Sequence, residues 1–373
     1  MDLLYSGHSA DASRVTMARR LTALTLAALI SSCASTLRTT ADDLLAGYRA
    51  PDSPGGAVMV IDRGRVVYTE AVGLADVEAG TPITLETNFR LASLTKQFTA
   101  MAIMILAERK AVSLDQPITD FFPDFAPVGR LITLKHLLTH TSGLVAYEDV
   151  MPETTSTPLL DADVLRLVRN IDSTYFTPGS AFRYSNTGYA LLALVVERAS
   201  HTTFARFLKD EIFDPLDMAG TVAYERAVSE VSHRAYGYSP DSTRQGKFQR
   251  TDQSMTSSVL GDGGIYSSLD DLRRWDEALR SGRLVSRETY REALTPHATV
   301  EEGVLWYGYG WYVEKFRGFP AHSHGGSTVG FRNHMLRIPE RNLTVIALFN
   351  RADARPEEAA RRLAEEYLDT LGQ

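Results

Sequence analysis

Strand-forming residues lie at both ends of this chain, and helical patterns lie between them. Residues 57–61 and 65–68 are rich in Val, Ile, Met and Tyr, and the intervening Asp62-Arg63-Gly64 predicts a tight hairpin. Strand patterns return near the C-terminal end, at residues 310–313, 334–338 and 343–348. Because hairpins, and not βαβ units, connect these strands, we expect one antiparallel sheet built from both ends of the chain.

The middle of the chain shows helical periodicity. Phe98, Met101, Ala102 and Ile105 fall at positions i, i+3, i+4 and i+7, which places them on one face of a helix. Further helical runs are expected at residues 189–199, 203–213 and 356–371. The predicted fold class is therefore α+β, an antiparallel sheet flanked by helices with an inserted, mainly helical domain.

The same pattern predicts domain boundaries. Residues 42–93 and 301–373 would form the sheet domain and residues 94–300 the helical domain, together making one unit over 42–373. The chain has 373 residues, of which 44% are hydrophobic, so it can bury a sizeable core. Its formal net charge of -7 disfavours a nucleic-acid partner, and the sequence leaves the oligomeric state open.

A short apolar run near the N-terminus predicts export. Two arginines at 19–20 precede the apolar residues 21–30, a run too short for a comfortable membrane span. The run ends Ile-Ser-Ser-Cys, which resembles a bacterial lipobox, so the only cysteine, Cys33, is the expected lipidation site. We predict that residues 1–33 are an export signal and that a lipid anchor holds the protein on the periplasmic side of a bacterial envelope. The alternatives are a soluble secreted or periplasmic protein and a chance match.

The first chemical pattern is Ser93-Leu94-Thr95-Lys96, at the start of a predicted helix. Residues three apart on a helix share a face, so the Lys96 amine would lie beside the Ser93 hydroxyl. Serine becomes a good nucleophile when a neighbouring base takes its proton, and a buried lysine can be that base. The helix N-terminus would stabilise negative charge developing there. The alternative is a helix-terminal serine with a solvated lysine.

Two further patterns carry polar groups. Tyr184-Ser185-Asn186 precedes a predicted helix, where a tyrosine could move a proton and an asparagine could hold a carbonyl or the lysine amine. His324-Gly325-Gly326-Ser327 lies between strand-like segments, and its glycines allow close backbone approach to a ligand. Each pattern has a structural alternative: a half-buried tyrosine with a helix cap, and a glycine bend with a surface histidine.

In this order, the three patterns resemble the family of class C β-lactamases, DD-peptidases and related esterases, in which S-x-x-K is a signature. Residues 132–144 and 263–268 resemble the family too, and the resemblance covers about residues 42–370. It implies one catalytic unit over 42–373 that works by acyl transfer through Ser93. Lys96 and Tyr184 would share the proton.

The resemblance also implies binding roles. Asn186 would position both the acyl side of the substrate and the Lys96 side chain. The backbone N–H groups of Ser93 and Ser327 would form an oxyanion hole. Tyr147 falls where the family often presents a side chain to the substrate.

The third pattern departs from the family's β-lactamases, which usually have Lys-Thr-Gly where this chain has His324, Gly325 and Gly326. Lysine supplies a fixed positive charge for a substrate carboxylate, whereas histidine is only partly charged at neutral pH. This substitution is more typical of the esterase and peptidase members of the family.

Metal and nucleotide chemistry is not indicated. His136 and His140 are spaced i, i+4 without the glutamate of a zinc protease motif, so both are expected to pack against helices. His322 and His324 alternate on one strand face and could chelate a metal, which is the less favoured interpretation. Residues 261–264 lack the lysine of a P-loop.

We therefore expect a serine hydrolase without cofactor or metal that acts on a small ester, amide or D-amino-acid peptide. The alternatives are a β-lactamase and a sensor that binds penicillin or peptidoglycan without turnover.

Overall fold

A computed structural model describes residues 35–372 of the chain. The predicted export signal over residues 1–33, with Cys33, lies outside the described residues. No helix within residues 35–372 combines the length and the apolar character needed to cross a bilayer.

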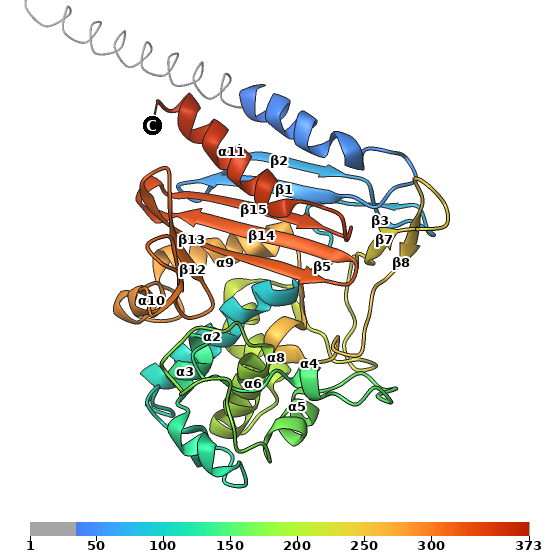
Figure 1. Ribbon diagram of the computed structural model, residues 1–373. Coiled ribbons are helices and arrows are strands. Elements are labelled where there is room, and N and C mark those ends of the chain that lie inside the picture. Colours follow the sequence, from blue (N-terminus) through green and yellow to red (C-terminus); the bar gives the residue numbers. More distant parts are fainter. Residues whose placement is uncertain (1–34, 373) are drawn as a thin grey trace, which may run out of the picture.

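Eight strands form one sheet in the order β10-β11-β12-β13-β14-β15-β1-β2 (Figure 1). β1 (Gly56–Asp62) lies between β2 (Arg65–Val72) and β15 (Leu343–Phe349), so the two ends of the chain meet inside the sheet. The other members are β10 (Ala298–Glu301), β11 (Leu305–Tyr307), β12 (Tyr312–Phe316), β13 (Phe319–Thr328) and β14 (Phe331–Ile338). All neighbouring pairs are antiparallel, which confirms the predicted α+β fold.

Helices cover both faces of this sheet (Figure 1). The helical residues 35–45 and α11 (Pro356–Thr370) pack on one face, where Val58 and Val60 of β1 join their core. Met59 and Ile61 point to the opposite face and join the larger core, because side chains alternate along a strand. α9 (Leu269–Ser281) covers that face, although it lies within the span predicted to form the helical domain.

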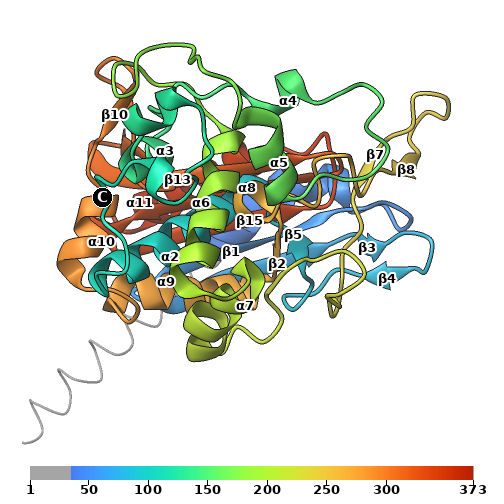
Figure 2. The same ribbon diagram turned by 90° about the horizontal axis from the view of Figure 1, so that it is seen from below.

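The helical region lies below the sheet in the view of Figure 1, and its helices pack around α2 (Lys96–Glu108) and α6 (Asn186–Ser200), as Figures 1 and 2 show. Every residue of α2 from 96 to 106 is buried, as expected for a helix enclosed on all sides. The other helices are α3 (Leu134–Leu138), α4 (Tyr147–Val150), α5 (Asp161–Val168), α7 (Phe204–Leu208), α8 (Leu260–Gly263) and α10 (Arg287–Ala293). Single turns are η1 (Ala46–Tyr48), η2 (Ala92–Thr95), η3 (Ile118–Asp120), η4 (Pro127–Leu131), η5 (Lys209–Phe213), η6 (Asp214–Leu216) and η7 (Pro339–Arg341).

Three small sheets connect the two regions. They are β3 (Leu74–Asp76) with β4 (Thr81–Pro82), β5 (Phe89–Arg90) with β9 (Ile265–Ser267) and β6 (Val222–Ala223), and β7 (Tyr238–Pro240) with β8 (Phe248–Arg250). Beyond β5, the N–H of Leu91 donates to Ile265 O at 2.8 Å, which fixes the chain just before Ser93.

Candidate active site

Ser93 lies in η2, the turn between β5 and α2. Ala92 has a left-handed backbone (φ 50°), which is unfavourable for a residue with a Cβ and turns the chain sharply. Ala92 and Leu94 are buried, whereas Ser93 is partly exposed, so this turn presents its hydroxyl to the cleft. α2 follows directly, and the N–H of its first residue, Lys96, donates back to the carbonyl oxygens of Ser93 and Leu94. Stabilisation of negative charge by the helix N-terminus stays a prediction.

Lys96 is completely buried beside Ser93, with its Nζ 3.2 Å from Ser93 Oγ. Nζ also donates to Asn186 Oδ1 and to the Asp262 carbonyl oxygen, each at 2.9 Å. An ammonium group uses all three N–H groups in these contacts. A neutral amine keeps two donors for Asn186 and Asp262 and directs its lone pair at Ser93, which is the geometry of a base.

Burial lowers the pKa of Lys96 to about 8, because desolvation disfavours the charged amine, while the negative charges of Asp262 and Glu148 oppose the shift. A useful fraction of the amine is therefore neutral near physiological pH.

We expect kcat/KM for p-nitrophenyl butyrate to rise about tenfold per pH unit below about pH 8 and to level off above it. The sign follows from the lowered pKa: below it the amine is protonated and cannot accept the Ser93 proton. The measurement is a pH–rate profile corrected with Ser93→Ala for spontaneous ester hydrolysis. A flat profile between about pH 6 and about pH 9 would contradict Lys96 as the base.

Tyr184 lies close to Lys96, whose Nζ is 4.9 Å from the centre of the phenol ring. Burial raises the pKa of Tyr184 well above its usual range, with Asp262 and Glu148 adding to the shift and a hydrogen bond with Ser93 opposing it. Tyr184 therefore keeps its proton at neutral pH. This arrangement suits a phenol that passes a proton on, with Lys96 as the stronger base.

His140 holds Tyr184 in place. Its ring is fully buried and lies 4.3 Å from the Tyr184 ring, centre to centre, and its Nδ1 accepts the Ser185 N–H at 3.1 Å. The sequence assigned His140 to packing. Its contact with Tyr184 is decided by the tertiary structure, since the two residues belong to different segments.

Asn186 begins α6, where the Ser185 hydroxyl caps the helix by accepting the Gly188 N–H. Its Oδ1 accepts from Lys96, and its Nδ2 donates to Glu148 Oε1 at 2.8 Å. Asn186 therefore links the lysine to an exposed carboxylate. The sequence did not single out Glu148.

The residues from His324 to Ser327 lie inside strand β13, not between strands as expected. A Cβ at Gly326 would collide with the Leu91 carbonyl oxygen, so only glycine lets β13 press against η2. This close approach overrides the weak strand propensity of glycine. It brings Ser327 to the side of Ser93, while the oxyanion hole formed by their N–H groups stays a prediction.

His324 is buried and both of its ring nitrogens are occupied. Nδ1 is 2.6 Å from Gly325 O, which can only accept, so Nδ1 carries the proton and Nε2 accepts from the Tyr307 hydroxyl at 2.9 Å. Burial lowers the pKa of His324 to about 3, with the charge of Lys96 contributing. His324 is thus neutral at working pH and supplies no positive charge for a substrate carboxylate.

Tyr147 differs from its expected position at the substrate surface. It is only 1% exposed, and its hydroxyl donates to Asp262 Oδ2 at 3.2 Å. It borders a small pocket of about 80 Å³ beside Ser93, whose other walls include Arg90, Asp262 and Thr256.

The main cleft has a volume of about 620 Å³. Ser93, Tyr184 and Asn186 lie at one end, and the cleft follows β13 past Ser327 toward α11. Another pocket, of about 680 Å³, is lined by residues of α7 and β6 and contains none of the motif residues. We therefore take the cleft at Ser93 as the candidate active site.

The sequence analysis did not identify the buried groups that hold α8 and its contact with Lys96 in place. Asp161 is buried and accepts the N–H groups of Leu260 and Gly261, at 2.9 and 3.0 Å. It thereby fixes α8, whose Asp262 carbonyl binds Lys96. Burial raises the pKa of Asp161 to about 7. The only sequence signal for this region was that residues 263–268, which adjoin α8, resemble the same family.

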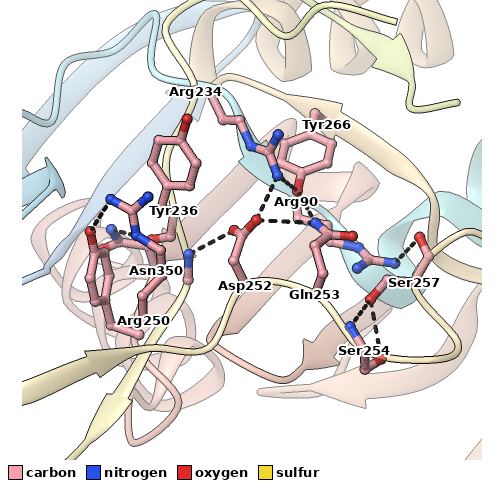
Figure 3. Close-up of polar contacts among 12 residues, drawn as sticks. Arg90, Arg234, Tyr236, Arg250, Asp252, Gln253, Ser254, Ser257, Tyr266 and Asn350 are labelled. Atoms are coloured by element: carbon pink, nitrogen blue, oxygen red, sulfur yellow. Dashed lines mark hydrogen bonds and ion pairs between the residues drawn. The ribbon is translucent and has the colours of Figure 1, made fainter. Parts of the chain in front are cut away.

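Figure 3 shows the polar contacts that hold the segment following β8. Arg234 binds Asp252 at 2.6 Å and the Tyr266 hydroxyl at 3.1 Å, and Arg90 donates to Ser257 O at 2.9 Å. These contacts anchor the segment on which Thr256 reaches the pocket.

The histidines weighed as metal ligands have separate partners. His136 Nδ1 accepts the Thr133 N–H at the start of α3, while His140 faces Tyr184. Within residues 35–372, no three His, Cys, Asp or Glu side chains gather as a metal site requires.

A serine turn packed against strand β13 of an antiparallel sheet, with a buried lysine and a tyrosine within reach, defines a serine hydrolase that works by acyl transfer. The family model described as Beta-lactamase matches residues 38–369, and the chain belongs to this family.

Named relatives agree with this assignment. The chain is 32% identical to penicillin-binding protein 4* of Bacillus subtilis (strain 168), over 84% of this chain and 72% of the relative. It is 29% identical to a D-aminopeptidase of Gluconobacter oxydans (strain 621H), over 83% of this chain but only 58% of the relative's length. An octameric penicillin-binding protein homologue from Pyrococcus abyssi has a similar structure, with a TM-score of 0.78, 28% identity, and coverage of 90% of this chain and 77% of the homologue.

Proposed function

We propose that this protein hydrolyses D-amino-acid amides or short peptides through an acyl-Ser93 intermediate. Ser93 Oγ attacks the scissile carbonyl while its proton passes to the neutral Lys96 amine. Tyr184 relays a proton to the leaving nitrogen as the C–N bond breaks. Water then attacks the acyl ester and releases the acid, which restores the Ser93 hydroxyl.

The observation that carries the proposal is the contact of Lys96 Nζ with Ser93 Oγ in a fully buried position. Two hydrogen bonds to fixed oxygens aim the amine, and burial keeps its pKa near the working pH. A protein that only binds ligands has no need for this combination.

The amino-acid part of the proposal is supported by Glu148. Its carboxylate is exposed, accepts a hydrogen bond from Asn186 Nδ2, and forms no ion pair with a basic side chain among residues 35–372. A free α-ammonium group on the acyl side of a substrate would form an ion pair with the Glu148 carboxylate. The similarity to a D-aminopeptidase supports the same substrate class.

We expect Glu148→Gln to lower kcat/KM for D-alanine p-nitroanilide by about 10- to 100-fold. Turnover of p-nitrophenyl butyrate, which has no ammonium group, should be retained, since Glu148 does not touch Ser93. Kinetics on both substrates make the comparison, with the exposed Glu153→Gln as the matched control. Equal losses on both substrates would contradict ammonium recognition by Glu148.

His324 is neutral and both of its ring nitrogens are hydrogen-bonded, so it cannot form an ion pair with the carboxylate of a β-lactam. This argues against the β-lactamase alternative. A chromogenic cephalosporin belongs in the same assay. Rapid cephalosporin hydrolysis without amide hydrolysis would overturn the proposal in favour of a β-lactamase. A stable acyl adduct on Ser93 without turnover would favour the sensor.

A further inference from the structure

The small pocket of about 80 Å³ meets the main cleft at the nucleophile. Ser93, Asn186 and Ser327 line both spaces, so each space borders the residue that carries the acyl group. The main cleft, at about 620 Å³, has room for a substrate, whereas the small pocket has room only for a few water molecules. The two spaces therefore suit two reactants of the same reaction, the substrate and water.

Asp262 lies in the wall of the small pocket with one carboxylate oxygen unpaired. Its side chain is buried, and its Oδ2 accepts the Tyr147 hydroxyl at 3.2 Å. Oδ1 accepts no hydrogen bond from a residue within 35–372. The nearby Arg90 donates instead to the carbonyl oxygens of Ser257 and Gly263, at 2.9 and 3.3 Å. A buried carboxylate oxygen without a partner is costly, so water is the expected partner of Oδ1.

The charges around Asp262 leave it ionised but basic. Burial raises the pKa of Asp262 to about 6, and the charge of Lys96 opposes this shift. A carboxylate of this kind is negative at neutral pH and can still take a proton from an attacking water. The titratable and charged groups that face it are Lys96, Glu148, Arg90, Tyr147 and Asp161.

The other two proton-handling groups are poorly placed to activate this water. Two N–H groups of Lys96 are directed at Asn186 Oδ1 and at the Asp262 carbonyl oxygen, and its third position faces Ser93 Oγ. In the acyl-enzyme this Oγ is the leaving oxygen, so Lys96 is aimed at the atom that must regain a proton. Tyr184 keeps its own proton because burial raises its pKa well above the usual range.

We propose that Asp262 is the general base of deacylation and takes the proton of a water molecule in the small pocket as this water attacks the acyl carbonyl carbon. The proposal rests on the acyl-Ser93 intermediate of the function proposed above. The water oxygen forms the new C–O bond, its proton goes to Asp262 Oδ1, and the bond between the carbonyl carbon and Ser93 Oγ breaks. Ser93 Oγ takes a proton from the Lys96 ammonium group. The proton on Asp262 then passes to the Lys96 amine, which restores both groups.

The test is the kinetics of Asp262→Asn on p-nitrophenyl butyrate at pH 7. Asparagine keeps an oxygen for the Tyr147 hydroxyl but cannot take a proton from water. We expect kcat to fall by about 100-fold or more and KM to fall with it. The ratio kcat/KM should not fall, because acylation does not use Asp262. A rapid release of nitrophenol equal to the protein concentration should precede slow turnover, and the mass of the variant should include a butyryl group.

The matched control is Asp217→Asn, which makes the same chemical change at an exposed position after η6 and should behave like wild-type protein. A lower kcat/KM without accumulation of the butyryl adduct would show that Asp262 only holds Lys96 in place. An unchanged kcat would assign the base to another group. Either result overturns the proposal.

A measurement on wild-type protein decides the question if Asp262→Asn does not fold. Rapid-quench mass measurement follows the loss of the butyryl group at different pH values. Its rate should rise about tenfold per pH unit below about pH 6 and leave this line above it. A rate that instead follows acylation up to about pH 8 would assign the base to Lys96, and a constant rate between about pH 5 and about pH 8 would exclude Asp262.

Failure of the proposed function gives a different result. Wild-type protein would then leave D-alanine p-nitroanilide uncleaved while the ester still acylates Ser93. The adduct measurements on the ester would decide on Asp262 in that case too.

Discussion

Ser93→Ala is expected to lower kcat by about 10⁴-fold or more, because no other hydroxyl replaces the atom that forms the acyl bond. The fold should survive, since the change removes one oxygen from a partly exposed turn and leaves the anchoring of Leu91 to Ile265 untouched. Kinetics on the ester and on D-alanine p-nitroanilide measure the loss, and thermal unfolding checks the fold.

Intact-protein mass measurement after a rapid quench adds direct evidence for the Ser93 assignment. Wild-type protein should carry an acyl mass that Ser93→Ala lacks. Ser242→Ala, an exposed serine far along the chain, should retain both activity and adduct. Residual turnover in Ser93→Ala near the wild-type rate would mean that Ser93 is not the nucleophile.

Lys96→Ala is expected to lower kcat by about 10³- to 10⁵-fold, because it removes the base that activates Ser93. Lys96→Arg should not restore the rate, since guanidinium stays protonated and has no lone pair to offer. The inflection near pH 8 should disappear from the residual activity of both variants.

Lys315→Ala is the matched control, because Lys315 is exposed on β12. Thermal unfolding must accompany the kinetics, since Lys96→Ala leaves Asn186 Oδ1 and the Asp262 carbonyl without their donor. A well-folded Lys96→Ala variant with a near-normal rate would assign the base to Tyr184 or to water.

Much of the fold was predictable because its signals are local. The hairpin of β1 and β2 follows from strand-forming residues around Arg63 and Gly64, both of which adopt positive φ in the turn. The helix at α2 follows from its apolar residues. By contrast, β13 was not recognised around Gly325 and Gly326, because the reason for glycine there is a carbonyl of Leu91, distant in the sequence.

The site was predictable where a residue type carries its own chemistry. Ser93, Lys96 and Tyr184 were proposed from their order and spacing, and the structure brings them together, with Ser93 and Tyr184 lining one cleft and Lys96 buried beside them. Glu148 was not found, because an exposed glutamate looks ordinary until its neighbours are known.

The sequence by itself determined the antiparallel sheet shared by both chain ends and the identity of the groups that can move a proton or form an acyl bond. These depend on side-chain type and on spacing within a segment, which the chain carries locally. Only the tertiary structure decided the protonation of these groups, because protonation depends on burial and on charges from distant segments. Lys96 acquires its lowered pKa by burial in a site whose hydrogen-bond partners Asn186 and Asp262 are 90 and 166 residues away, and the charge of Asp262 opposes the shift. His324 loses its charge by burial.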